Sequence, residues 1–218
     1  MLALALWLLG SAVLWRTSSQ PAYSWEVVIE GAEATGALGS ELVGGQRVFV
    51  SMTSIRSRLS GVAPTIESIF LGTLQPDRLF LLLSNESHLL DSGVSRDEIL
   101  AHPIAELAKR WPLTVVFTEN IGPHRKLLPL LSRKWSEDCV IVTVDDHELY
   151  PRSMLESLLK FYLVSRRRSV VALRSRRMGV CSQLPWQLTP YTRNRRGLWP
   201  EMSPGRREML VSLVACSA

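Results

Sequence analysis

Two kinds of hydrophobic pattern alternate along this chain and predict its secondary structure. Short runs of apolar, often β-branched residues predict strands at 48–53, 79–83, 113–117, 140–144 and 170–173. Apolar positions three or four residues apart predict helices at 64–74, 95–110, 126–134 and 151–164. Pro103 lies inside the second of these helical segments, and we expect it to break or kink that helix.

The alternation of strands and helices predicts an α/β fold with a mainly parallel sheet flanked by helices. The 218 residues are enough for one sizeable domain of this class. Parallel strands end at the same edge of a sheet, and ligands of open α/β sheets bind at that edge. Polar residues follow four of the predicted strands: Thr53-Ser54, Ser84-Asn85, Glu119-Asn120 and Asp145-Asp146-His147. We therefore expect a binding crevice there.

The fourth predicted strand, Val140–Val144, runs directly into Asp145-Asp146-His147. Its continuous apolar run indicates a strand buried on both faces, and charged groups at such a strand's end are costly to bury without a partner. Carboxylates and an imidazole can together hold Mn²⁺ or another divalent cation, which would neutralise a diphosphate. On the motif alone, a surface loop with two solvated acids is the alternative.

Two further loops carry candidate ligand-binding side chains. Thr53 ends the first predicted strand, where a hydroxyl can bond a base or ribose, and Arg56 or Arg58 just beyond it can reach a phosphate. Gly122-Pro123 predicts a tight turn, after which Lys126 would sit in the first turn of a helix, a natural anion site. A solvated lysine is the alternative. The chain has no glycine-rich dinucleotide motif and no P-loop, which disfavours both kinds of site.

The N-terminal residues predict entry into the secretory pathway. Residues 2–15 are uncharged and apolar, and Arg16 follows them. This length suits a signal peptide or a signal anchor over residues 1–16, with a buried N-terminal helix as the alternative. The glycosylation sequon Asn85-Glu86-Ser87 agrees with a lumenal or secreted domain. Residues 17–46 are rich in glycine and weakly periodic, and we expect them to form a stem or linker.

The net charge of +5 comes from arginine, because only four of the 25 basic residues are lysine. Many of the arginines lie between Arg166 and Arg207, which opens the possibility of an anionic membrane surface or nucleic acid as partner. Aromatic residues do not interleave with these arginines as in RNA-binding proteins, which disfavours nucleic acid. The three cysteines, Cys139, Cys181 and Cys216, fit neither a zinc pattern nor a disulfide framework.

Several segments together resemble one enzyme family. Val50–Arg58, Pro64–Ile69 and Gln75–Leu79 resemble the amino-terminal half of family-2-like GT-A glycosyltransferases. Gly122–Pro129 resembles their Gly-Pro-x-x-Lys-Leu-x-Pro segment. Asp145-Asp146-His147 resembles their Asp-x-Asp motif, with histidine in the last place, as in the Asp-x-His version of polypeptide N-acetylgalactosaminyltransferases. The resemblance covers about residues 47–173.

The resemblance implies a GT-A-like, Rossmann-like domain over residues 47–175 that binds a nucleotide-diphospho-sugar donor. It implies that Asp146 and His147 hold Mn²⁺ or another divalent cation. The implied acceptor is an unassigned glycan, protein or lipid, and the implied location is the lumenal side of the Golgi or endoplasmic reticulum membrane, or outside the cell if the N-terminus is cleaved. The donor-binding residues that it implies are Thr53, Arg58, Lys126 and Asp145.

The acceptor side of the resemblance is incomplete. A GT-A domain continues past its metal motif with an acceptor-side half, whereas about 70 residues follow His147 here. We expect residues 176–218 to form an irregular, arginine-rich tail, and no acceptor motif is recognisable in it. By residue type alone, the candidates for a catalytic base are Glu156, Glu201 and Glu208. An inactive, truncated glycosyltransferase-like binding protein is therefore the alternative to an active transferase.

Overall fold

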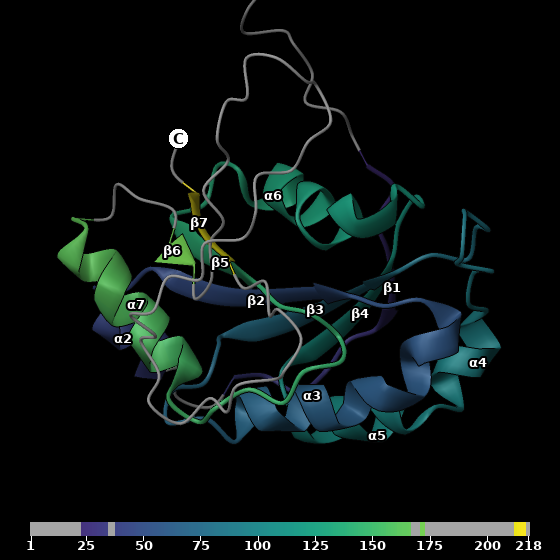
Figure 1. The fold of residues 1–218 in the computed structure, drawn as a ribbon, viewed down its shortest axis with the longest axis horizontal. Helices are drawn as coiled ribbons and strands as arrows, with labels where there is room; N and C mark the ends of the chain where they lie inside the picture. The colour runs from purple at the N-terminus through teal and green to yellow at the C-terminus, as the bar shows by residue number, and fades with distance from the viewer. Residues whose placement is uncertain (1–22, 35–37, 167–170, 173–211, 217–218) are drawn as a thin grey trace, which may run out of the picture.

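The computed structural model describes residues 23–34, 38–166, 171–172 and 212–216 (Figure 1). The predicted apolar N-terminal segment and most of the predicted arginine-rich tail, including Glu201 and Glu208, lie outside these ranges. Within the described ranges, no helix combines the length and the apolarity needed to cross a membrane.

The described strands form one seven-stranded sheet in the order β1-β4-β3-β2-β5-β7-β6. The four central strands pair in parallel, whereas β1, β7 and β6 add antiparallel pairs at the two sides. This arrangement confirms the predicted α/β class with a mainly parallel sheet centre. The bounds are β1 Glu26–Ile29, β2 Arg47–Thr53, β3 Arg78–Leu83, β4 Leu113–Phe117, β5 Cys139–Thr143, β6 Val171–Ala172 and β7 Ser212–Cys216.

The strand order reverses between β2 and β5. From β2 the chain adds β3 and then β4 on one side, and it then returns to place β5 on the other side of β2. Loops that leave neighbouring strands on opposite sides of such a switch point diverge, which leaves a crevice at the carboxyl ends of the strands. The loops after β2 and β5 therefore border the place where this fold class binds ligands.

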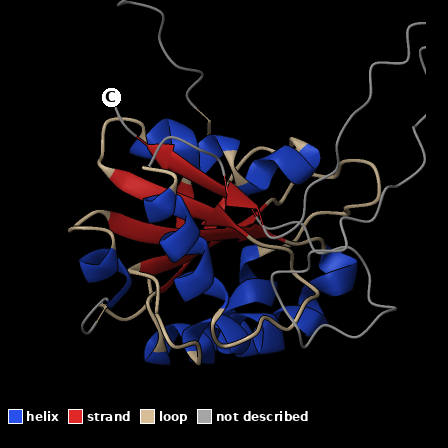
Figure 2. Cartoon of the chain, turned by 60° about the vertical axis from the view of Figure 1, so that its left-hand side comes forward, coloured by secondary structure: helices blue, strands red, loops and turns tan. Residues whose placement is uncertain are grey.

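Helices cover both faces of the sheet (Figures 1 and 2). The larger core cluster packs β2, β3, β4 and β5 against α3, α5 and α7, and a smaller cluster packs the other face against α6. All five residues of β5 are buried, as predicted for a strand covered on both faces. The helices are α2 Leu38–Leu42, α3 Val62–Phe70, α4 Arg96–Leu100, α5 Pro103–Arg110, α6 Leu128–Lys134 and α7 Met154–Val164, with 3₁₀ turns η1 Arg56–Gly61 and η2 Gly122–Lys126.

Proline residues set two helix boundaries. The predicted break at Pro103 is confirmed, because α4 ends at Leu100 and α5 begins at Pro103. The prediction that Lys126 lies in the first turn of a helix is wrong, since Lys126 ends η2 and α6 begins at Leu128. Pro129 agrees with this boundary, because it lies in the first turn of α6, where its missing N–H costs no hydrogen bond.

Short elements appear in two segments that we predicted to be irregular. The interval 17–46 contains β1 and α2, and the interval 176–218 contains β7. β1 is an edge strand of four residues in which only Val28 is buried, so its sequence shows almost no alternation. α2 has only five residues. Contacts with the rest of the fold, rather than a local sequence pattern, determine such elements.

Candidate functional site

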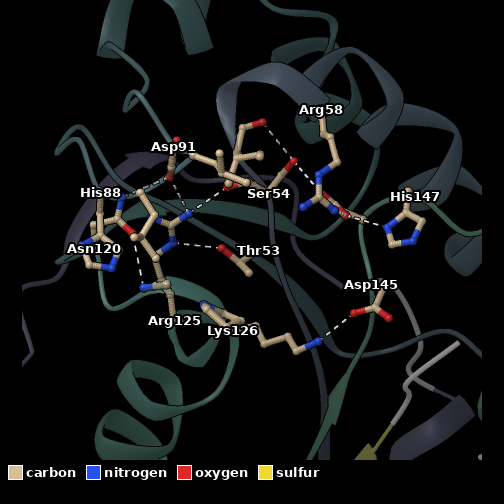
Figure 3. Close-up of a pocket in the computed structure, with 16 residues that line it drawn as sticks. Thr53, Ser54, Arg58, His88, Asp91, Asn120, Arg125, Lys126, Asp145 and His147 are labelled. Atoms are coloured by element: carbon tan, nitrogen blue, oxygen red, sulfur yellow. Dashed lines mark hydrogen bonds and ion pairs between the residues drawn. The ribbon is translucent and has the colours of Figure 1, made fainter. Parts of the chain in front are cut away.

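A cavity of about 560 Å³ opens at the carboxyl ends of the four parallel strands, beside the switch point (Figure 3). Each of the four strands is followed by residues that line it, so the predicted convergence of strand ends is confirmed for the loops after β2, β4 and β5. Ser84 and Asn85 are not part of the lining; the segment His88–Asp91 lines it instead. The lining comprises Thr53–Ile55, Arg58, His88–Asp91, Asn120, Gly122, Pro123, Arg125, Lys126 and Asp145–His147.

Lys126 and Asp145 form an ion pair in the wall of the cavity. The ammonium Nζ lies 2.7 Å from the carboxylate Oδ1, and the two side chains are 17% and 21% exposed. The backbone on both sides of the pair is held in place. Ser51 Oγ donates to the carbonyl of Lys126 at 2.5 Å, and the amide of Asp145 donates to the hydroxyl of Tyr150 at 2.8 Å. The backbone of both residues is thus held in the wall, and the ion pair joins their side chains.

Asp146 is the most buried group of the motif, with only 4% of its surface exposed. Ser54 Oγ donates to its Oδ2 at 2.6 Å, and Arg58 Nη1 lies 3.2 Å from its Oδ1. The hydroxyl of Thr65 donates to its backbone carbonyl at 3.2 Å. These contacts join the loop after β5 to the loop after β2 across the switch point, and they offset the cost of burying the carboxylate.

His147 lies beside Asp146 and is 37% exposed at the side chain. Its Nδ1 is 2.9 Å from Asp146 Oδ1, and its Nε2 is 3.9 Å from Glu148 Oε1. A carboxylate that holds one ring nitrogen orients the imidazole and leaves the other nitrogen for a ligand, as around protein-bound metals. Asp146 therefore connects Ser54, Arg58 and His147 through a single carboxylate.

Tyr150 holds the loop after β5 through hydrogen bonds to the backbone of Asp145. Its hydroxyl accepts from the amide of Asp145 and donates to the carbonyl of that residue at 3.3 Å. Its own amide donates to Ser68 Oγ at 3.1 Å. Burial raises the pKa of Tyr150 well above its usual value, so the phenol stays neutral at physiological pH. A neutral hydroxyl can both donate and accept, as these two contacts require.

Within the described part of the chain, Arg125 is the largest fully buried side chain, at 1% exposure, and it lines the opposite end of the cavity. Its Nε donates to Thr53 Oγ1 at 2.9 Å, and its Nη2 donates to the carbonyl of Ser54 at 2.8 Å and to Asp91 Oδ2 at 3.2 Å. Burial lowers the pKa of Arg125, and the contact with Asp91 offsets only part of this lowering. Among the described residues, its Nη1 has no hydrogen-bond partner.

Asp91 closes a tight turn whose tip reaches the mouth of the cavity. His88 and Asp91 exchange backbone hydrogen bonds of 2.8 and 3.0 Å, and the tip residues Leu89 and Leu90 are 88% and 90% exposed. Asp91 also accepts from Asn120 Nδ2 at 3.1 Å, as Figure 3 shows. The exposed apolar side chains of Leu89 and Leu90 therefore lie next to the buried carboxylate of Asp91.

The Asp145-Asp146-His147 motif can supply only some of the ligands of a divalent cation, so the remaining ligands would come from substrate or water. Among the described residues, no group of three or more His, Cys, Asp and Glu side chains is close enough to hold a metal ion. Asp145 and His147 offer the oxygen and nitrogen donors that Mn²⁺ accepts, with phosphate oxygens and water left to complete its shell. Asp146 fits less well as a ligand, because both its oxygens already have partners.

The six residues that the sequence suggested for the site all line the cavity: Thr53, Arg58, Lys126, Asp145, Asp146 and His147. Glu156 does not, because it lies in α7 and bonds Thr73 and Lys160 at the surface. Sequence reasoning missed Arg125 and Asp91, which lie 34 residues apart and meet only in the folded chain. The one available signal for Arg125 was its position between the Gly122-Pro123 turn and Lys126.

No protein-family model matches this chain, and no curated protein matches it in sequence. The fold and the cavity define an α/β protein with a charged crevice at a topological switch point.

Proposed function

We propose that this protein is a metal-dependent glycosyltransferase of the GT-A type, which moves a sugar from a nucleotide-diphosphate donor to a glycan, protein or lipid acceptor. One observation carries the proposal: the cavity at the switch point brings Arg58, Lys126 and the Asp145–His147 loop together. A cavity of about 560 Å³ lies in the range of small-molecule and cofactor sites. The resemblance of the surrounding segments to GT-A glycosyltransferases adds to this support.

The two ends of the cavity suit the two ends of such a donor. Lys126 and Arg58 supply positive charge for the diphosphate and lie beside the metal motif. At the other end, Arg125 lines the cavity and would face the nucleoside, while Leu89 and Leu90 offer apolar contact. Thr53 would act mainly through Arg125, since its hydroxyl already bonds Arg125 and the carbonyl of Leu82.

Asp145 and His147 would face the Mn²⁺ ion, or another divalent cation, and Asp146 would hold His147 in orientation. When bound, the ion would act as a Lewis acid on the departing nucleoside diphosphate. This assignment keeps the predicted role of His147. It moves Asp146 from ligand to supporting residue, because Ser54 and Arg58 already occupy its oxygens. It also moves Asp145 from the donor-binding residues to the cation ligands.

A lumenal location is part of the proposal. It rests on the apolar segment at residues 2–15 and on the sequon at Asn85. Asn85 is exposed at the carboxyl end of β3, where a glycosylating enzyme could reach it. Expression through a secretory pathway should therefore give a chain that loses mass on treatment with peptide N-glycosidase, and the Asn85→Gln variant should show no such loss.

Titration calorimetry with UDP- and GDP-sugars, with and without Mn²⁺, tests the proposal. We expect His147→Ala to abolish the Mn²⁺-dependent part of donor binding, and Asp145→Asn to weaken binding by removing a charge without changing shape. His124→Ala is the matched control, because His124 is exposed and does not line the cavity. Absence of heat with every donor, in folded protein, would contradict the proposal.

A second candidate function is donor binding without transfer. The ion pairs of the cavity favour this function. Among the described residues, the carboxylates of Asp91, Asp145 and Asp146 are each paired with a cationic side chain. A paired carboxylate is a poor general base. Donor binding in calorimetry, together with no sugar released to water or to an acceptor mixture, would select this function.

A further inference from the structure

The Lys126–Asp145 pair occupies an oxygen that the proposed cation would use. The ammonium lies 2.7 Å from Asp145 Oδ1, and both side chains are about four-fifths buried. A divalent cation near this carboxylate would be repelled by the ammonium at short range, in surroundings where solvent screens charges poorly. The cation and the ammonium therefore compete for Asp145.

We propose that Lys126 and Asp145 form an exchangeable latch, an inference that rests on the proposed function. Without ligand, Lys126 holds Asp145. When the donor and the cation bind together, the cation takes Asp145 and Lys126 turns to the diphosphate, which gives the freed ammonium a new anionic partner. The flexible four-carbon stem of lysine and its compact charge suit such a change of partner.

The neighbouring Arg58–Asp146 pair does not exchange in the same way. Asp146 is buried, its second oxygen accepts from Ser54, and its first oxygen also holds His147. Arg58 is half exposed, whereas Lys126 is not. The two cationic side chains thus have different roles. Arg58 adds positive charge to the cavity, whereas Lys126 occupies Asp145, the carboxylate that the divalent ion would use.

The latch makes the two ligands depend on each other. Mn²⁺ alone has to displace Lys126 with no new partner for the ammonium, and a diphosphate alone has to draw Lys126 away from Asp145. Each ligand therefore raises the affinity for the other by the same factor. Removing the ammonium relieves the competition, so Mn²⁺ alone should bind more tightly, while the diphosphate loses a contact and binds more weakly.

The test measures the Mn²⁺ affinity of the whole chain without nucleotide, by titration calorimetry and by electron paramagnetic resonance of the free ion. Lys126→Met should raise this affinity about fivefold or more, because a mostly buried pair is screened less than an exposed one. Arg58→Gln removes one charge from the same cavity and should give a clearly smaller rise. Lys160→Met, which breaks an exposed pair on α7, should leave the affinity unchanged.

A second readout is the factor by which UDP or GDP raises Mn²⁺ affinity, which should shrink in Lys126→Met. Lys126→Gln provides the same test if the methionine variant does not fold. Unchanged Mn²⁺ affinity in both Lys126 variants, or equal rises for Lys126→Met and Arg58→Gln, would overturn the latch. If the wild type still binds nucleotide with Mn²⁺ in that case, the proposed function stands. Binding of neither ligand by any variant would overturn both.

Discussion

Arg125 connects three polar partners at one end of the cavity. Its guanidinium contacts Thr53 at the end of β2, Ser54 in the loop that follows, and Asp91 in the loop after β3. A buried guanidinium with fixed partners holds these loops in one arrangement, and its remaining nitrogen has no partner among the described residues. The same side chain therefore stabilises the fold and lines the cavity.

The Arg125–Asp91 pair should matter most when only one partner is removed. Arg125→Met leaves a carboxylate buried without its cation, so we expect a loss of about 3–5 kcal/mol in the free energy of unfolding. The double variant Arg125→Met/Asp91→Leu should lose less than the sum of its two single variants. Urea unfolding measures all three. A loss below about 1 kcal/mol in Arg125→Met would contradict the role of this pair.

Tyr150 should make stability depend on pH in the alkaline range. Burial raises its pKa in the folded state, so between about pH 10 and the raised value the unfolded chain releases a proton that the folded chain keeps. This contribution to stability is complete below about pH 10 and is lost as pH rises. The melting temperature of Tyr150→Phe should therefore fall less steeply above pH 10 than that of the wild type.

A parallel decline in Tyr150→Phe and wild type would contradict this reasoning. At neutral pH the variant should lose about 1 kcal/mol in the free energy of unfolding, since the amide and the carbonyl of Asp145 lose their shared partner.

At the scale of elements, long buried runs were predictable from the sequence and short edge elements were not. Val140–Val144 predicted β5 because burial on both faces leaves an unbroken apolar pattern. Pro103 predicted the division of α4 from α5 because proline disrupts a helix interior. The four residues of β1 carry no comparable pattern, since only Val28 is buried.

The N-terminus of α5 has an unusual cap that should respond to pH. His102 Nδ1 accepts a hydrogen bond from the amide of Ile104 at 3.3 Å, which requires a ring nitrogen without a proton. Burial lowers the pKa of His102, so below about pH 6.5 the unfolded chain takes up a proton more readily than the folded chain. Stability is therefore lost as pH falls through this range.

His102→Asn isolates this cap, because asparagine can accept the same bond and does not titrate. The melting temperature of the wild type should fall more than that of His102→Asn between pH 8 and pH 5. His102→Ala should lose about 0.5–1 kcal/mol in the free energy of unfolding at pH 8. Equal pH slopes for wild type and His102→Asn would show that the imidazole does not titrate with folding.

At the scale of the whole molecule, the sequence predicted that polar strand ends would meet but not how. Strand order depends on long-range packing, so the switch point between β2 and β5 appears only in the folded chain. This order explains why Ser54 and Asp146, 92 residues apart, share a hydrogen bond. The prediction for Ser84 and Asn85 is wrong because the chain after β3 reaches the cavity only at His88, which no local pattern indicates.

The most direct test of the account is a thermal-shift panel of nucleotide sugars on the full chain, with and without Mn²⁺. A ligand that binds only the folded state adds about 2.7 kcal/mol of stability at a hundredfold excess over its dissociation constant, which raises the melting temperature by several degrees. We predict such a rise for a subset of UDP- or GDP-sugars, larger with Mn²⁺ present and independent of Mn²⁺ in His147→Ala. No rise with any nucleotide sugar at millimolar concentration, with or without Mn²⁺, would contradict the account.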